Sequence, residues 1–405
     1  MRIESDMMRL KPIALVLGFL TLISSLIVGD YNQADSKLSD FYSQMLAADF
    51  PAARGSIDEA IRLWPTNARY YAWRGYNSSQ NLTPQCRRYF LGSRSALSAV
   101  EQHAISEAIA DYGRALELNS RDAVAHHNRA WLEHLIGDDY AAEKDWQEAT
   151  AIDPETAVLR VSYGMFLEES GKVQAGREQI EVSIQLSPSI VDSPFFTRYR
   201  IRSQEAADTI VAHSLAEMER ELRNRKDPIL EARLGKLYVY SHNLPRSMQL
   251  LQDAARQLPN LPLVWFNLGE AYLSRGDTTR AMDCYRKANL INDSLASPYL
   301  RMGQIYLHSG QRELANLNLR QTVDRWQRRT PITASHNNRL YSGPKQRIDD
   351  LLPTTLVWFA APCEASEAYQ GLAELAAPRE RSRYVTYART CEQIPAPHRS
   401  PPEKQ

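Results

Sequence analysis

The clearest pattern of apolar and polar positions lies in WFNLGEAYLSRG, at residues 265–276. Trp265, Leu268 and Tyr272 are three and four residues apart, which places them on one face of a helix. Gly269 lies inside this helical pattern, where glycine costs about 1 kcal/mol relative to alanine and therefore needs a packing reason. The stretch predicts an amphipathic helix that makes a close contact at its glycine.

The same arrangement returns 34 residues later, in YLRMGQIYLHSG at residues 299–310. Tyr299, Met302, Gly303 and Tyr306 take the places of the earlier Trp, Leu, Gly and Tyr. Further copies stand upstream in register, and prolines close them. Their matching residues are Leu234, Gly235, Tyr238 and Pro259; Ala130, Gly137, Ala142, Trp146, Ala149 and Pro154; and Gly164, Leu167, Gly171, Ile180 and Pro188. The sequence therefore predicts a repeat of paired helices.

This repeat resembles the tetratricopeptide repeat, whose units carry Trp-x2-Leu-Gly-x2-Tyr followed by Ala, an aromatic residue, Ala and Pro. The fullest copy here is Trp265, Leu268, Gly269, Tyr272, Ala281, Tyr285 and Ala288, with Asp293 where proline is usual. The resemblance covers roughly residues 37–329. It implies an all-α fold, in which antiparallel helix pairs stack into a right-handed superhelical solenoid with a concave groove for peptides or partner helices.

Elementary packing supports the same fold. One helix pair cannot bury its apolar face alone, so the units must stack on one another. Glycine or alanine at the contact allows two helix backbones to approach, while large side chains such as Trp265, Tyr272 and Tyr285 fill the space against the next unit. Proline after the second helix cannot continue it and starts the following turn.

Two stretches break the period. Residues 77–103 interrupt a unit with a small basic and aromatic stretch, for which we expect a solvated loop, a binding loop being the alternative. Residues 189–227 are too long for one unit.

The chain as a whole is expected to divide into seven segments. These are a cytoplasmic N-terminus (1–11), a transmembrane signal-anchor (12–29), an N-terminal array (37–188, insertion 77–103), degenerate linker helices (189–227), a C-terminal array (228–329), a helical cap (330–393) and a disordered tail (394–405).

The anchor rests on an uncharged run of 18 residues between Lys11 and Asp30, close to the roughly 20 residues that a membrane-spanning helix needs. Basic residues precede the run and acidic residues follow it, so the positive-inside rule places the bulk of the chain outside the cytoplasm. A cleaved signal peptide and a buried helix are the alternatives.

The composition narrows the classes of function that the chain could have. The 48 basic and 48 acidic residues cancel, which removes the usual argument for nucleic-acid binding. The four cysteines show no metal-finger spacing. We expect Cys284 to be a small buried hydrophobe, whereas Cys363 and Cys391 could form a disulfide in an oxidising compartment.

No catalytic signature stands in the chain: GxSxG, GxxxxGK[ST], HExxH and GxGxxG are all absent. His126, His127 and His134 are the best metal candidates, because His127 and His134 share a helix face. Zinc would need further ligands, so we expect partly buried or groove-lining histidines, no metal and no cofactor. Asp138–Asp139 and Glu168–Glu169 are expected to be caps and solvated charges.

The resemblance directs attention to the groove, which the first helix of each unit lines. Two groove positions per unit, following the Trp265 position by two and five, carry polar groups suited to carboxylates or peptide backbone in the last three units. Earlier units are more aromatic there, although Trp73, Tyr76 and Trp131 could equally pack into neighbouring units. The candidate groove residues are Arg233, Lys236, Asn267, Glu270, Arg301, Gln304, Asn128 and Trp131.

The sequence thus predicts a membrane-anchored repeat scaffold without catalysis, which binds a peptide or partner protein in its groove and organises an envelope-associated complex. One alternative is an accessory subunit of a polysaccharide or secretion system that contacts a glycan or lipid-linked substrate. The other is an enzyme with its site between residues 77–103 and the C-terminal module. The partner, the pathway, the oligomeric state and cleavage of the amino-terminal segment stay open.

Overall fold

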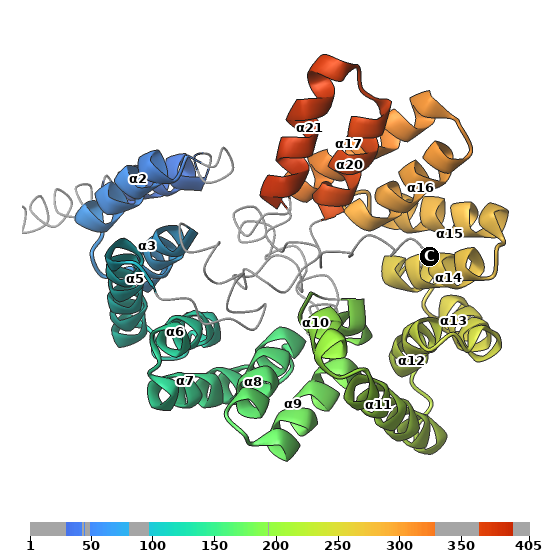
Figure 1. Ribbon diagram of the computed structural model, residues 1–405, viewed down its shortest axis with the longest axis horizontal. Coiled ribbons are helices and arrows are strands. Elements are labelled where there is room, and N and C mark those ends of the chain that lie inside the picture. Colours follow the sequence, from blue (N-terminus) through green and yellow to red (C-terminus); the bar gives the residue numbers. More distant parts are fainter. Residues whose placement is uncertain are drawn as a thin grey trace, which may run out of the picture. The chain divides into compact units, whose positions relative to one another are not determined.

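In the computed structural model, described over residues 30–42, 44, 49–80, 97–192, 194–328 and 364–391, every regular element is a helix (Figure 1). The chain forms two compact units, one of Met1–Leu82 with Leu97–Ala125 and one of Thr83–Ala96 with His126–Gln405. The predicted anchor and tail, residues 81–96 of the insertion and residues 330–363 lie outside the described residues. The all-α prediction is confirmed for the described chain.

The first unit contains α2 (Phe50–Leu63), α3 (Ala68–Gln80) and α5 (Ala99–Leu118). α3 and α5 pack against each other although residues 77–103 were expected to interrupt this unit. Their contact is close at Gly75, where an added Cβ would lie 3.2 Å from both the Ala108 carbonyl oxygen and the Tyr112 ring. The interruption therefore falls between the two helices of one hairpin.

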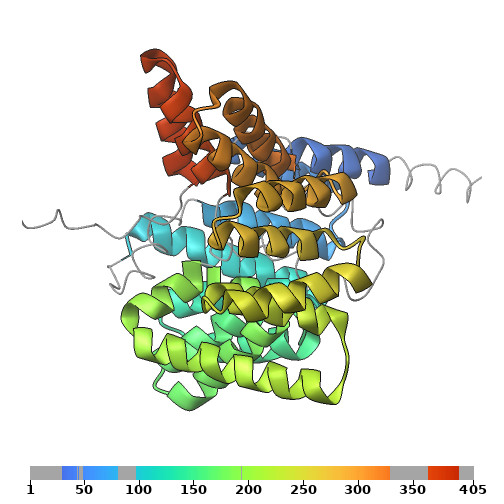
Figure 2. The same ribbon diagram turned by 90° about the vertical axis from the view of Figure 1, so that its right-hand side faces the viewer.

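The second unit is built from helix hairpins, most of which pack directly against the next hairpin. Figure 2 shows the last of them, in red, beside the orange helices at one end of this series. The hairpins are α6–α7 (Ala123–Ile136, Asp139–Ile152), α8–α9 (Ala157–Glu169, Val173–Leu186), α12–α13 (Pro228–Tyr240, Leu244–Gln257), α14–α15 (Pro262–Ser274, Thr278–Ile291), α16–α17 (Ala296–His308, Arg312–Arg328) and α20–α21 (Glu364–Leu375, Pro378–Cys391).

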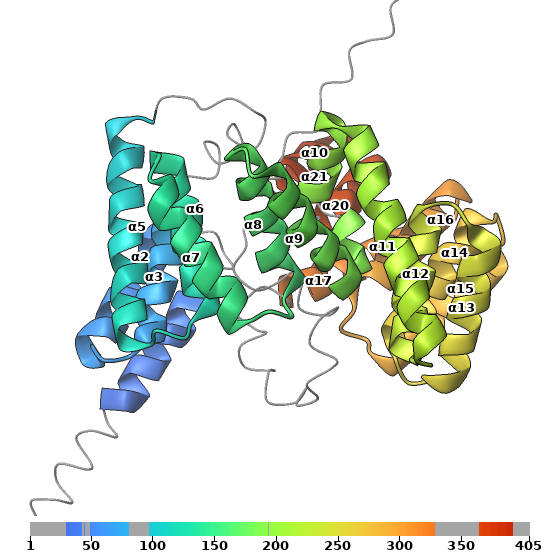
Figure 3. The ribbon, with the colours of Figure 1, turned by 90° about the horizontal axis from the view of Figure 1, so that it is seen from below.

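The long stretch between α9 and α12 is also helical. It forms a 3-10 helix, η1 (Pro188–Asp192), then α10 (Pro194–Arg202) and the long α11 (Gln204–Asn224). α11 packs against α9 on one side and α12 on the other, as Figure 3 shows. The stretch that breaks the period is therefore helical, and its long helix packs against the repeat helices on both sides of it.

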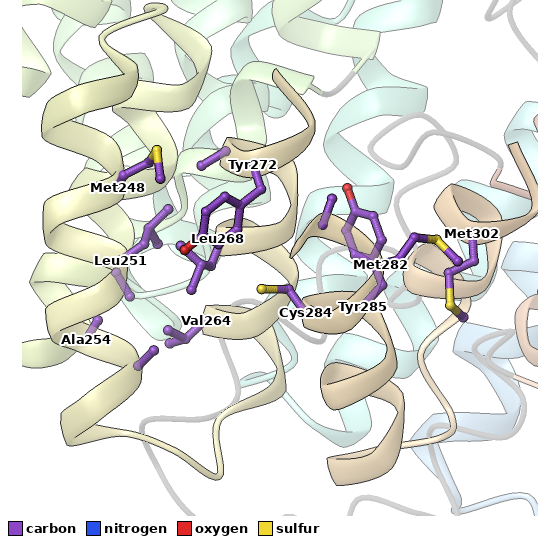
Figure 4. Close-up of a cluster of buried hydrophobic side chains, with 14 residues drawn as sticks. Met248, Leu251, Ala254, Val264, Leu268, Tyr272, Met282, Cys284, Tyr285 and Met302 are labelled. Carbon is purple, nitrogen blue, oxygen red and sulfur yellow. The ribbon is translucent and has the colours of Figure 1, made fainter. Parts of the chain in front are cut away.

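The glycine of the opening pattern lies where two helices meet. A Cβ on Gly269 would come within 2.5 Å of Cε1 in the Tyr285 ring. Leu268 and Tyr272 pack with Met248 and other residues of α13 in one buried cluster (Figure 4). Cys284 is buried in the same cluster, and this burial raises its pKa to about 11. The structure confirms the packing roles predicted for these residues.

Four of the hairpin turns share one conformation, in which a glycine has a positive φ. Gly276 has a φ of +84°, and the Asp277 amide donates to the Tyr272 carbonyl oxygen at 2.9 Å, which ends α14. Asp277 then caps α15 by accepting from the Arg280 amide at 3.2 Å. Asp138 caps α7 in the same way, as the sequence predicted.

No helix among the residues that the structure describes is both long and apolar enough to cross a membrane. The predicted signal-anchor over residues 12–29 and the predicted partner of Cys391, Cys363, fall in the part that is not described.

Candidate functional site

The six groove candidates of the last three units lie on three successive first helices. We call them the polar row: Arg233 and Lys236 on α12, Asn267 and Glu270 on α14, and Arg301 and Gln304 on α16. Because they recur every 34 residues, they occupy equivalent positions on successive first helices, of which α12 and α14 pack directly together. The sequence predicted six polar groups open to a ligand.

Two members of the row instead bind each other. Arg301 donates from Nε to Glu270 Oε1 at 3.1 Å and from Nη2 to Oε2 at 3.1 Å. The Tyr285 hydroxyl donates to the same carboxylate at 2.6 Å. Burial of the guanidinium would lower the pKa of Arg301, but the charge and hydrogen bonds of Glu270 outweigh it and raise this pKa. This pair joins α14 to α16.

Two further members are also engaged. Gln304 accepts from Arg301 and donates to Glu367 of α20 at 2.8 Å, so the last hairpin closes on the row. The Lys236 ammonium lies 2.7 Å from Asp192 of η1. Exposure is low as well, at 7% for Lys236 and 4% for Asn267. Five of the six groups are therefore buried or paired within this chain, because packing between units engages them.

Arg233 differs from the rest of the row. Its side chain is partly buried, and its Nε atom is buried without a hydrogen-bond partner. Among the described residues its guanidinium forms no ion pair within 4.0 Å, whereas Lys236 and Arg301 each have a carboxylate. A buried donor left unsatisfied costs about 1–3 kcal/mol. The accessible part of this guanidinium keeps donors for a carboxylate or carbonyl of another molecule.

The aromatic candidates of the earlier hairpins pack inward. Trp131 is 7% exposed, donates from Nε1 to His127 Nε2 at 3.2 Å, and has its ring 5.1 Å from Trp146. Trp73 is buried in the first unit against Phe41. Asn128 is buried too. Of the two interpretations left open for the tryptophans, the structure supports packing.

The three candidate metal histidines take separate roles. His126 Nδ1 lies 2.8 Å from Asp145, and His134 Nδ1 lies 2.6 Å from Asp139. Burial lowers the pKa of His127 to about 3, so this ring is neutral at ordinary pH. In the described parts of the chain, no three His, Cys, Asp or Glu side chains gather in a way that could hold a metal ion.

Sequence reasoning missed a buried charged cluster in α6–α7, which we call the polar seam: His126, Arg129, Glu133 and Asp145. Arg129 donates to both Asp145 oxygens, at 2.6 and 2.8 Å. Burial, with the nearby Asp145 charge, raises the pKa of Glu133 to about 7. When Gly137 is aligned with Gly276, these four residues fall on Trp265, Leu268, Tyr272 and Cys284. Polar residues at four positions that are apolar in the other hairpin were therefore a sequence signal for the polar seam.

Comparison with known proteins gives matches to tetratricopeptide repeats. A family model for the tetratricopeptide repeat matches residues 233–293. Human "Tetratricopeptide repeat protein 6" is 25% identical over 210 residues, which are 49% of this chain and 38% of that protein. "Small glutamine-rich tetratricopeptide repeat-containing protein 2" of Mycosarcoma maydis is 34% identical over 94 residues, 23% of this chain and 26% of that protein. The matched stretches thus span about a third of these curated relatives.

Among solved structures, yeast Tom70 is similar with a TM-score of 0.36 and 12% identity, over 87% of this chain and 88% of Tom70. The agreement is too loose to carry an argument about function. The family model and the two curated relatives agree with the helix hairpins and their glycine contacts. This chain is a tetratricopeptide-repeat protein.

Proposed function

We propose that this chain is a noncatalytic scaffold that binds a segment of another protein at Arg233, on the exposed side of the polar row. Tetratricopeptide repeats are built for protein–protein contact, because successive hairpins create an extended surface. The proposal places the ligand over α12 and α14, next to the engaged residues of α16.

The observation that carries the proposal is the unpaired guanidinium of Arg233. Lys236 and Arg301 are each neutralised by a carboxylate of this chain, so they have little to offer a ligand. Arg233 keeps its planar fork of donors for a carboxylate or for a backbone carbonyl. Asn267 occupies the equivalent position on the next helix but is buried, so Arg233 alone of the two is available to the segment.

The test compares Arg233→Ala with Arg223→Ala, which removes an exposed, unpaired arginine of α11. Peptides selected from a random library on the wild-type protein are measured by fluorescence anisotropy. Arg233→Ala is expected to weaken binding about tenfold, since a charge-assisted hydrogen bond contributes about 1.5–3 kcal/mol. Its melting temperature should not fall, because the substitution also removes the unsatisfied buried Nε. Equal affinities for the two variants would remove Arg233 from the site.

The two alternative functions have less support. A glycan surface would need exposed rings, and Trp73 and Trp131 are buried. An enzyme site between residues 77–103 and the C-terminal module would rest largely on residues 81–96 and 330–363, outside the described chain.

We also propose that residues 12–29 anchor the scaffold in a membrane, with the repeats on the extracytoplasmic side and an envelope complex as the partner. The apolar run and the flanking charges support this topology. A reporter enzyme active only outside the cytoplasm, fused after Ala60, should be active. An inactive fusion, alongside activity of the same reporter fused before Lys11, would reverse the orientation.

A further inference from the structure

Several arginines of the last hairpin, α20–α21, and of the neighbouring α17 have no carboxylate partner among the described residues. Elsewhere in the described chain most arginines pair with a carboxylate within 4.0 Å, as Arg246 does with Glu219. On these three helices, five arginines form no such pair with any described residue, although the whole chain is electrically neutral. They are Arg312, Arg320, Arg379, Arg381 and Arg383.

Two of these guanidiniums bind tyrosine hydroxyls. Arg320 of α17 donates from Nη2 to the Tyr384 hydroxyl at 3.0 Å, and Arg383 donates from Nε to the Tyr387 hydroxyl at 2.7 Å. The ring of Tyr369, on α20, lies 6.3 Å from that of Tyr384 and 5.3 Å from that of Tyr387. The rings thus hold the two cations at fixed places across three helices.

Apolar surface lies next to these cations. Leu317 is 55% exposed and precedes Arg320 by three residues, so the two share one face of α17. Leu314, three residues earlier, is also exposed. We call the group formed by Leu317, Arg320, Tyr369, Arg383, Tyr384 and Tyr387 the C-terminal surface.

We propose that the C-terminal surface binds an acidic segment of a partner protein that also carries apolar side chains. Carboxylates of the segment would bind Arg320 and Arg383, which have no carboxylate of their own among the described residues. An apolar side chain of the same segment would cover Leu317. This surface is separate from Arg233, so it would hold a second partner or a second part of the first.

Charge complementarity indicates that the partner is negatively charged. α21 (Pro378–Cys391) contains four arginines and one glutamate, so its sequence carries a net positive charge. Single-stranded nucleic acid is the other polyanion to consider, but it needs free aromatic faces on which bases stack. Here the Tyr369 and Tyr384 rings stack on each other at an interplanar angle of 27°. One face of each ring is thus used within the protein, and the Arg383 guanidinium lies over the Tyr387 ring, 5.4 Å from its centroid, which favours an acidic peptide.

The experiment uses the full chain and a fluorescent peptide of repeated Glu-Glu-Leu units, with a Gln-Gln-Leu peptide and labelled oligothymidine as comparisons. Anisotropy should show binding of the Glu peptide, weakened by salt, and none of the Gln peptide. The double variant Arg320→Glu/Arg383→Glu is expected to lose at least about tenfold in affinity for it. Arg320→Lys/Arg383→Lys should retain most of the binding, because the charge stays.

The matched control is Arg121→Glu/Arg223→Glu, which makes the same charge change at exposed arginines outside this surface and should bind within about twofold of wild type. Circular dichroism must show the same helix content in all variants. Equal loss in the control variant overturns the proposal, as does no binding of the Glu peptide by the wild-type protein. Tighter binding of oligothymidine that is lost in Arg320→Glu/Arg383→Glu overturns it in favour of nucleic acid.

Discussion

Replacing Gly164 with alanine is expected to destabilise the protein by about 2–3 kcal/mol, a cost typical of overpacking at a tight contact. The new Cβ would lie 2.7 Å from both the Gly176 carbonyl oxygen and Ile180 Cγ1. Neither neighbour can yield easily, because one is helix backbone and the other belongs to a β-branched side chain. Urea unfolding followed by circular dichroism measures the loss.

Two other glycines provide the comparison. At Gly55, inside α2, an added Cβ would meet nothing within 4 Å, so Gly55→Ala should stabilise by about 0.5–1 kcal/mol through helix propensity alone. At Gly235 the atoms met belong mainly to the Leu251 side chain, which can shift, so Gly235→Ala should cost about 1 kcal/mol. A stabilised Gly164→Ala variant would show that α8 and α9 separate without cost, contrary to the described contact.

These glycines show what the sequence could predict. Gly269 was expected at a helix contact because a glycine inside an amphipathic helix weakens that helix, and its return in register indicates that close packing offsets the cost. The structure places it against Tyr285. Such contacts occur within one hairpin, between residues 16 apart, so the local repeat defines them. The same locality explains why the helix pairs and their turns were predictable.

The candidate site was less predictable because its contacts join different units. Glu270 binds Arg301, 31 residues away, and Gln304 binds Glu367, 63 residues away. The first pair could have been found, since opposite charges stood at neighbouring groove positions of adjacent units. The second could not, because residues 330–363 interrupt the period and hide the register of α20. Arg233 was one of the candidates named from the sequence, but only the pairing of its neighbours in the structure distinguishes it from them.

The polar seam leads to the second large effect. Asp145→Ala should destabilise by about 3 kcal/mol, because it removes the carboxylate 2.6 Å from Arg129 and leaves that guanidinium with only Glu133, at 3.5 Å. The Asp145 side chain is only 4% exposed, so the hydrogen bonds that are lost lie inside the packed hairpin. Glu148→Ala on the same helix removes an exposed carboxylate and should change stability by less than about 0.5 kcal/mol.

A double variant distinguishes the contribution of the Arg129–Asp145 ion pair to stability from the cost of removing only one of its partners. Arg129→Leu places at this position the residue type that Leu268 supplies in α14, so Arg129→Leu/Asp145→Ala leaves no buried cation unpaired. We expect it to be about 1–2 kcal/mol more stable than Asp145→Ala alone, because apolar residues often replace a buried ion pair without loss. Chemical unfolding of both variants gives the difference. If the double variant loses the sum of the two single effects, Arg129 stabilises α6 by packing rather than by its charge.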